Sequence, residues 1–397
     1  MELEAAGSRI LLDYGLPLDD QETVRSRCHV PEEHLLPLPG LCEPEVPRFD
    51  GILLSHAHPD HHGLLGYVHS EIPIYANRET QELLRIGEYF YPEARPVRNL
   101  QTVAAGEPFT VGAFRVTPYL MDHSAYGALA FLIEAGGRRV FYSGDFRGHG
   151  RKDSVFRHLV ADPPAPVDVL MLEGTVIGRA DKGLPSEVAV QHELERLFRQ
   201  HHDLTVIAFS SQNADRIVSI YKACLRSGKI FVIDPYTAYV LHKLGGKLPQ
   251  FDYKDVRIYF APGSHTQRLA KHGDLFFFQD AKVDFQEMLE NRARVVIKNT
   301  YAIREKFART ETLTGAALVY SQWWGYFENE REFWTAHGIE PIPVHTSGHA
   351  HVTDLQKLVR ALRPRIILPV HTRHPAAYPE LFGEKALVLP DGQSLEI

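Results

Sequence analysis

The sequence has few cysteines, no long apolar run and no excess of positive charge. Its three cysteines, Cys28, Cys42 and Cys224, are far apart and form no Cys-x-x-Cys pair, so no disulfide framework is expected. Thiols used in this way are typical of a reducing compartment, which predicts a cytoplasmic protein. No apolar stretch approaches the roughly 20 residues that a membrane-spanning helix needs, and the first residues lack the features of a signal peptide. A membrane is therefore not an expected partner.

The charge balance excludes one class of nucleic-acid binder. The formal net charge is −7, which argues against a protein that wraps nucleic acid by bulk charge. It leaves room for a local basic cleft, because Lys and Arg together number 43. With 397 residues, of which 44% are hydrophobic, the chain is long enough for two or three packed domains.

Histidine is abundant, with 22 residues, and four ligand-type side chains gather in His56-Ala57-His58-Pro59-Asp60-His61. Imidazole nitrogen and carboxylate oxygen are the atoms that zinc binds. A short buried strand is expected at 51–55, and Gly63–Tyr67 is expected to start a helix. The side chains at 56 and 58 can point the same way, while 60 and 61 return from the opposite side of a tight turn. This arrangement suits two metal ions with open positions for water. A histidine-rich surface loop is the alternative.

Short β-rich runs alternate with helical patterns, which is typical of α/β proteins. Residues 1 to about 175 are dense in predicted strands, at 9–13, 114–118, 128–133 and 139–143, with a hairpin turn at Gly136-Gly137. From about 176, a helix capped by Ser186 and further helices alternate with apolar strands at 205–209, 229–234, 294–297 and 317–321. This second series is typical of a doubly wound sheet.

Further candidate ligands follow predicted strands. They are His123, Asp145 and His371, the last at the tip of a strand at 365–370. A sheet that gathers strand ends at one edge would gather these side chains in one place, and an aspartate can bridge two metals with its two oxygens. Taken singly, each has an ordinary alternative, a turn aspartate or a surface histidine.

Together, residues 10–17, the motif at 56–61, His123, Asp145 and His371 resemble the successive motifs of the metallo-β-lactamase fold. Leu172-Glu173-Gly174-Thr175, a long insert and then Ser347-Gly348-His349-Ala350 resemble its β-CASP branch, which includes ribonuclease J and the pre-mRNA 3′-end endonuclease. The resemblance implies a four-layered αββα sandwich with an inserted α/β domain. The implied boundaries are 1–175 and 345–397 for the catalytic domain, with the β-CASP domain at 176–344 forming a lid over the cleft.

The resemblance also implies a dinuclear centre of two Zn2+ ions, with Mn2+ as the alternative metal. One ion would be held by His56, His58 and His123, and the other by Asp60, His61 and His371, with Asp145 between them. Metal-activated hydroxide would attack the phosphorus of RNA. Asp13 is expected to hydrogen-bond one of the metal-binding side chains without contacting the metal itself.

Two residues separate this branch from a metal-only hydrolase. His349 can donate a proton to the departing 3′ oxygen, and Glu173 can hold that imidazole in its cationic form. Asp60, His349 and Glu173 are accordingly the expected catalytic residues. A strand is expected at 343–346 and a helix soon after 349, so that backbone N–H groups near Ser347 could hold a phosphate.

Substrate contacts are less sharply indicated. Ser210 and Ser211 precede a helix and offer a second anion site, although simple helix capping explains them equally well. Trp323 and Trp324, with Tyr326 and Phe327, could stack bases, but buried packing is the preferred interpretation.

The sequence also departs from the family pattern. His371 is followed by Thr372-Arg373 in place of the usual Gly-Glu, Gly174 replaces a usual serine, and about two dozen residues follow His371. A histidine at 371 favours RNA over DNA. A second hypothesis is a hydrolase of a small ester, lactone or nucleotide-like molecule, and a third is a silent binding module. Oligomeric state is open, with a homodimer possible.

Overall fold

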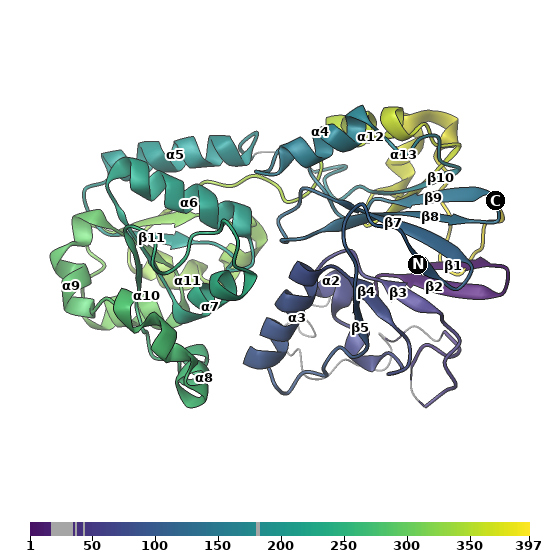
Figure 1. The fold of residues 1–397 in the computed structure, drawn as a ribbon. Helices are drawn as coiled ribbons and strands as arrows, with labels where there is room; N and C mark the ends of the chain where they lie inside the picture. The colour runs from purple at the N-terminus through teal and green to yellow at the C-terminus, as the bar shows by residue number, and fades with distance from the viewer. Residues whose placement is uncertain (17–34, 36–37, 43, 180–182) are drawn as a thin grey trace. The chain divides into compact units, whose positions relative to one another are not determined.

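The structure, a computed structural model, describes residues 1–16, 35, 38–42, 44–179 and 183–397. Its two compact units are Met1–Asp181 with Gly348–Ile397, and Lys182–Ser347 (Figure 1). The predicted domains 1–175, 176–344 and 345–397 stay a prediction, and each change of unit comes a few residues after the predicted boundary. Cys28 lies outside the described residues, and Cys42 and Cys224 are free thiols.

The first unit contains two sheets. The first sheet has the order β1 (Glu2–Ala5), β2 (Ser8–Leu12), β3 (Gly51–Leu53), β4 (Ile74–Ala76) and β5 (Leu100–Thr102), parallel except for the β1–β2 pair. The second sheet has the order β17 (Ile366–Val370), β10 (Val169–Glu173), β9 (Arg138–Tyr142), β8 (Leu129–Ala135), β7 (Phe114–Leu120) and β6 (Phe109–Val111). Its β17–β10–β9 part is parallel and the remainder antiparallel.

Apolar side chains from both sheets form one core between them, including Leu12 and Leu53 from the first sheet and Phe131 from the second. The outer face of the second sheet is covered by α4 (Asp153–Ala161), α12 (Val352–Leu362) and α13 (Tyr378–Phe382), whose apolar stripes enter a second core. Helix α3 (Arg78–Phe90) lies beside the first sheet (Figure 1). The layers therefore run helix, sheet, sheet, helix, which confirms the predicted four-layered α/β sandwich.

The second unit is built on one parallel sheet. Its order is β13 (Val256–Ile258), β12 (Ile230–Ile233), β14 (Val295–Lys298), β11 (Thr205–Ala208), β15 (Ala317–Tyr320) and β16 (Pro341–Pro343). Helix α5 (Glu187–Gln200) precedes the first of these strands in the chain. The helices between the strands are α6 (Ala214–Ser227), α7 (Pro235–Leu244), α8 (Ser264–His272), α9 (Phe285–Glu290), α10 (Tyr301–Arg309) and α11 (Arg331–Ala336). The doubly wound α/β pattern expected from the sequence is present, and the hydroxyl of Ser186 caps α5 as predicted.

Two local predictions are wrong. The helix expected from Gly63 is only a short 3-10 turn, Leu65–Tyr67, because the helix starts earlier at Pro59 and ends at His62. The strand expected at 343–346 ends at Pro343: Pro341 and Pro343 lack an N–H, and after Val344 the chain leaves the sheet.

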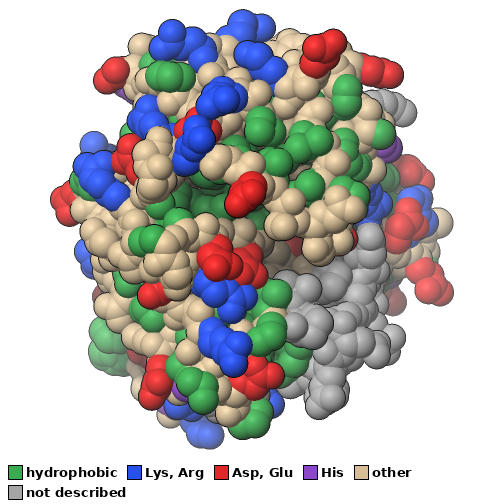
Figure 2. Space-filling view, turned by 90° about the vertical axis from the view of Figure 1, so that its right-hand side faces the viewer, with side chains coloured by type: hydrophobic (Ala, Val, Ile, Leu, Met, Phe, Trp, Pro, Cys, Tyr) green, Lys and Arg blue, Asp and Glu red, His purple; other side chains and the backbone are tan. Residues whose placement is uncertain are grey.

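Charges of both signs are interspersed on the face of the molecule shown in Figure 2. That face carries no broad patch of a single sign, as expected from a net charge of −7. Among the described residues, no helix combines the length and apolar character required to cross a bilayer.

A fully buried ion pair lies inside the second unit. Arg216 on α6 donates to both carboxylate oxygens of Glu187, at 2.8 and 3.2 Å. The same guanidinium donates to the hydroxyl of Ser321 at 3.0 Å and to the carbonyl of Thr346 at 3.4 Å. Arg216 therefore ties α5 and the end of β15 to the segment that leaves the unit.

We expect Arg216→Ala to destabilise the second unit by about 3–5 kcal/mol, because it removes the cation that is paired with the buried Glu187 carboxylate. The measurement is urea unfolding followed by tryptophan fluorescence, since all three tryptophans, Trp323, Trp324 and Trp334, belong to this unit. Arg226→Ala is the control: Arg226 pairs with Glu195 but is half exposed, so its loss should cost at most about 1 kcal/mol. Equal losses in the two variants would contradict the assigned role of Arg216.

Candidate metal centre

The motif at 56–61 is split between a loop and a helix. His56 and His58 follow β3, while Asp60 and His61 lie on the single-turn helix α2 (Pro59–His62), which Pro59 starts. This helix is fixed by the segment after β2, where the N–H of Tyr14 donates to the carbonyl of His61 at 2.8 Å. The sequence predicted a tight turn here, and the helix achieves the same reversal of direction.

Three imidazoles form one group of candidate ligands. His58 Nδ1 lies 3.0 Å from His56 Nε2 and 3.2 Å from His123 Nε2. Nitrogen ligands of a tetrahedral zinc ion, each 2.0–2.1 Å from the metal, lie about 3.3 Å apart. The three nitrogens are thus nearly at the separation that the ion would require.

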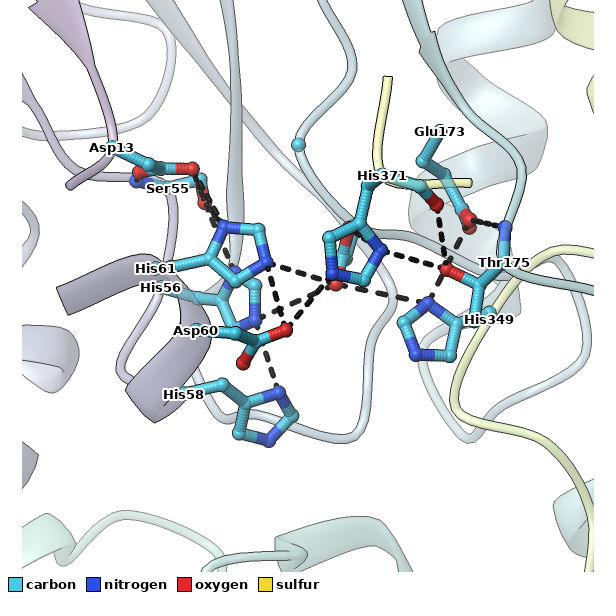
Figure 3. Close-up of polar contacts among 12 residues, drawn as sticks. Asp13, Ser55, His56, His58, Asp60, His61, Glu173, Thr175, His349 and His371 are labelled. Carbon is cyan, nitrogen blue, oxygen red and sulfur yellow. Dashed lines mark hydrogen bonds and ion pairs between the residues drawn. The ribbon is translucent and has the colours of Figure 1, made fainter. Parts of the chain in front are cut away.

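A second group contains Asp60, His61, Asp145 and His371 (Figure 3). His371 Nε2 lies 2.8 Å from Asp60 Oδ2, and His61 Nε2 lies 3.2 Å from Asp145 Oδ2. The same Asp145 oxygen is 3.8 Å from His56 Nε2 of the first group. Asp145 therefore faces both groups, as a bridging carboxylate would.

The donor set fits divalent metal ions. Asp145 is 1% exposed and His61 is 3% exposed, yet both oxygens of Asp145 and Nε2 of His61 have no hydrogen-bond partner among the residues that the structure describes. Burying such atoms without a partner costs free energy, and buried charges are normally paired or bound to a metal. A pair of cations between the two groups would satisfy all three atoms.

The first group is ready to bind metal at neutral pH. Burial, reinforced by neighbouring imidazoles, holds the pKa values of His56 and His123 well below the usual histidine range. Burial also lowers the pKa of His58, to about 4. All three rings are therefore neutral at pH 7, which is the form that binds metal.

The two histidines of the second group are protonated when no metal is bound. Burial opposes a charge on His371, but the carboxylates of Asp145 and Asp60 outweigh it and raise the pKa to about 9. For His61, burial is likewise outweighed by Asp145 and Asp13, and its pKa is raised well above the usual value. Burial disfavours the anion of Asp60, yet the hydrogen bond from His371 and the nearby imidazoles lower its pKa to about 2.

The expected support from Asp13 is present. Its Oδ2 accepts from His61 Nδ1 at 2.7 Å, from the Ser55 hydroxyl at 2.7 Å and from the Tyr142 hydroxyl at 2.5 Å. Asp13 itself has a positive φ of 51°. Ser55 and Tyr142 were not predicted, because the sequence identified them only as residues of strands. Burial and the adjacent Asp13 raise the pKa of Tyr142 well above 10, so its hydroxyl remains a donor.

Glu173 and His349 meet beside the second group (Figure 3). His349 Nδ1 lies 3.7 Å from both Glu173 Oε2 and Asp145 Oδ2. Glu173 is fully buried, and its two oxygens accept from the N–H groups of Ala350 and Thr175, each at 3.0 Å. The carboxylate thus fixes the backbone next to His349 as well as facing its ring.

Thr175 is a further residue that the sequence did not single out. Its hydroxyl lies 2.7 Å from His371 Nδ1 and donates to the carbonyl of His371 at 3.2 Å. His371 has a positive φ of 49°, an uncommon backbone conformation for a residue other than glycine. Thr175 therefore orients the imidazole by contacting both its ring and its backbone.

The replacement of the usual serine by Gly174 has a steric reason. A Cβ atom at 174 would lie 2.1 Å from the hydroxyl oxygen of Tyr378, which donates to the carbonyl of Leu172 at 2.9 Å. No side chain fits between that hydroxyl and the backbone. Helix α13 thus packs directly behind the strand that carries Glu173.

The three serines predicted to contact substrate lie in the second unit, whereas the metal ligands lie in the first. Ser347 is half-buried and directly precedes Gly348 in the chain. Ser210 is exposed, but Ser211 is buried and contacts Thr237 and Lys298. The helix that follows is capped by Asn213, so capping by either serine is not the explanation. Helix α12 begins at Val352, soon after His349 as predicted.

The exposure of the aromatic residues after β15 contradicts the prediction that they pack in a buried core. Phe327 is buried, but Trp323, Trp324 and Tyr326 are 49%, 42% and 54% exposed. Core packing therefore explains only one of the four rings.

The sequence matches two protein families. Residues 9–210 match the Beta-lactamase superfamily domain, and residues 342–379 match the Zn-dependent metallo-hydrolase RNA specificity domain. The first match covers half of the chain, and the chain belongs to the beta-lactamase superfamily. Together with the relatives below, the two matches confirm the resemblance to the metallo-β-lactamase and β-CASP family of ribonuclease J.

Similar proteins include a ribonuclease from Thermus thermophilus, 28% identical over 68% of this chain and 62% of its own length. Ribonuclease J of Mycolicibacterium smegmatis is 25% identical over 83% of this chain and 59% of its own length. The chain thus spans about three fifths of these relatives. A crystal structure of a protein of unknown function from Enterococcus faecalis V583 has the same fold, with a TM-score of 0.76 and 20% identity over 98% of this chain and 94% of that one.

We expect Tyr142→Phe to weaken metal binding about 10-fold and Asp13→Asn about 10- to 100-fold, because both changes loosen the support of His61. The measurement is competition with a chelator, and the metal-free proteins should keep the wild-type circular dichroism. Tyr119→Phe on β7, a tyrosine that packs against Phe141, is the matched control and should leave metal affinity unchanged. Wild-type affinity in both Tyr142→Phe and Asp13→Asn would refute the role of this network.

The pKa values predict that the two metal positions respond differently to pH. The imidazole group is already deprotonated at pH 6.5, whereas His371 must lose a proton whose pKa is about 9. We expect one zinc equivalent to bind with little pH dependence, and the affinity for the second to rise from pH 6.5 to about 9, with proton release in calorimetry. Parallel pH dependence of both equivalents would contradict this assignment.

Metal affinity at the second position should rise with pH, but the stability of the metal-free protein should fall. A raised histidine pKa stabilises the fold fully below pH 6.5, and this contribution is lost as the pH rises through about 9. The melting temperature of the metal-free protein should therefore fall over this range, and His371→Gln should remove part of the fall.

Proposed function

We propose that this protein is a metal-dependent phosphodiesterase that cleaves RNA. The observation that carries the proposal is the meeting of the two ligand groups with Glu173 and His349. A hydrolase that relied on metal alone would not need this carboxylate and imidazole. The match to an RNA specificity domain and the ribonuclease relatives support RNA as the substrate.

The residues present would hold two Zn2+ ions, with Mn2+ as the alternative. His56, His58 and His123 would bind one ion, Asp60, His61 and His371 the other, and Asp145 would lie between them. When bound, the ions would supply a nucleophilic water at neutral pH and offset the charge of the phosphate.

The protein's own groups would perform the remaining steps. Asp60, with its low pKa, stays ionised and can accept a hydrogen bond in the site at all physiological pH values. His349 would donate a proton to the departing 3′ oxygen, a role supported by its partly exposed imidazole beside the ligand groups. Glu173 favours the cationic ring from 3.7 Å and fixes its loop through Ala350.

Phosphate contacts are assigned to Ser347, Ser210 and Ser211. Ser347 adjoins Gly348, whose carbonyl lies 2.7 Å from Nδ1 of the metal ligand His123. Ser210 is exposed and offers its hydroxyl directly. Ser211 would act through Lys298, since its hydroxyl lies in a buried network with this cation and Asp234.

A hydrolase of a small nucleotide-like, ester or lactone substrate is the second candidate. The net charge of −7 favours it, because a long RNA is normally held by a basic surface. In either case we propose a cytoplasmic location and, as a possible assembly, a homodimer.

The test is hydrolysis of 5′-phosphorylated and 5′-hydroxyl oligonucleotides, RNA beside DNA, together with metal analysis of the same preparation. RNA cleavage by the zinc-loaded protein supports the proposal. Turnover of a small nucleotide or ester with no cleavage of any oligonucleotide would select the second candidate instead.

We expect His349→Ala to bind the wild-type amount of zinc while kcat falls about 100- to 10,000-fold, as for loss of a general acid. Glu173→Gln should lower kcat in the same direction. His158→Ala, which replaces an exposed histidine on α4, is the control and should retain full activity. Undiminished kcat in His349→Ala would exclude its role as the acid.

A further inference from the structure

The exposed aromatic residues after β15 are not used by the proposed mechanism. We define the segment Trp323, Trp324, Gly325 and Tyr326 as the aromatic ledge. Two of the chain's three tryptophans lie in it and are 49% and 42% exposed, whereas Trp334 is fully buried. Exposed tryptophans in a pair are costly in water and usually mark a binding surface.

The ledge is a built surface, not a loose loop. A Cβ at Gly325 would lie 2.3–2.6 Å from the outer ring atoms of Trp323, so this ring lies flat against the glycine backbone. Trp323 also meets Tyr326 edge to face, with ring centroids 5.1 Å apart. One face of the indole is therefore supported, while half of the side chain remains in solvent.

Trp324 is anchored in a similar way. It stacks on the buried Phe327, with centroids 4.9 Å apart, and meets Tyr320 edge to face at 5.5 Å. Both indoles are thus fixed before any ligand arrives, which lowers the entropy cost of binding a flat partner.

The charges around the ledge largely cancel. Arg331 pairs with Glu328, and Arg304 pairs with Glu330 at 3.0 Å. A phosphate backbone would gain little here, so attraction at the ledge depends on ring stacking. Every nucleobase offers a π-face, and stacking on aromatic side chains is how single strands are bound without sequence readout.

The position in the fold also favours nucleic acid. The ledge follows the carboxyl end of β15 in a parallel sheet, the edge at which α/β domains bind ligands. Strand β15 pairs with β16, where Val319 and Tyr320 lie opposite Ile342 and Pro343. Residue 342 begins the match to the RNA specificity domain.

We propose that the aromatic ledge stacks the bases of single-stranded RNA, an inference that rests on the proposed function and extends it to a second contact for the strand. The contact is independent of base identity and of phosphate neutralisation. It adds affinity for longer single strands over short ones and over duplexes.

The experiment is a fluorescence titration of the zinc-loaded His349→Ala protein, which is expected to cleave RNA at least about 100-fold more slowly than the wild type, with single-stranded RNA 12-mers. We expect binding to quench the exposed tryptophans, leaving emission from Trp334. Trp323→Leu should weaken binding about 5- to 100-fold, and Trp323→Phe should restore part of the loss. Gly325→Ala should also weaken binding, since it displaces the indole while keeping both tryptophans.

The salt dependence separates stacking from charge. The slope of log affinity against log salt should be the same in Trp323→Leu and the parent protein, because no phosphate contact is removed. Phe276→Ala is the matched control, since Phe276 is 78% exposed elsewhere in the same unit. It should leave RNA affinity unchanged.

Three outcomes would overturn the inference. If Trp323→Leu binds RNA like its His349→Ala parent and, with His349 intact, cleaves RNA like the wild type, the ledge is not a contact although the proposed function stands. If the substitution instead converts a dimer to a monomer in light scattering, the ledge is an interface between two copies. If the wild-type protein neither binds nor cleaves RNA, the proposed function has failed and the ledge loses its ligand with it.

Discussion

The burial of the Asp145 carboxylate among imidazoles is the constraint on which the site depends. Both of its oxygens are removed from water and have no hydrogen-bond partner in the described part of the chain, which a folded protein tolerates only with compensating positive charge. Protons on His61 and His371 provide that charge in the metal-free protein, and metal ions would provide it in the loaded protein. The same carboxylate thus explains the raised imidazole pKa values and the affinity for cations.

The compensation requires rigid surroundings, and these come from segments far apart in the chain. Tyr142 reaches Asp13 from β9, Thr175 reaches His371 after β10, and Glu173 holds the N–H of Ala350. Each bond joins residues separated by 129 to 196 positions. The two sheets must therefore pack correctly before any ligand is oriented.

The sequence predicted the candidate ligands because polar residues at the ends of apolar strands are visible without a structure. His56, His123 and Asp145 all follow such strands, and the sandwich fold was predicted from the resemblance that these motifs carry. Tyr142 and Thr175 could not be predicted in this way, since nothing in a strand's sequence shows which distant carboxylate or imidazole its hydroxyl meets. The exposure of Trp323 was also invisible, because an aromatic run looks the same whether it packs inside or lies on a glycine.

The side chain of Tyr378 fills the space that a side chain at position 174 would need. The phenol oxygen stands where a Cβ at 174 would be, behind the strand that ends in Glu173. A homologue with serine at the first position cannot keep tyrosine at the second without moving its last helix. The two positions should therefore co-vary in an alignment, and their pairing would distinguish this chain's lineage from the other branches of the superfamily.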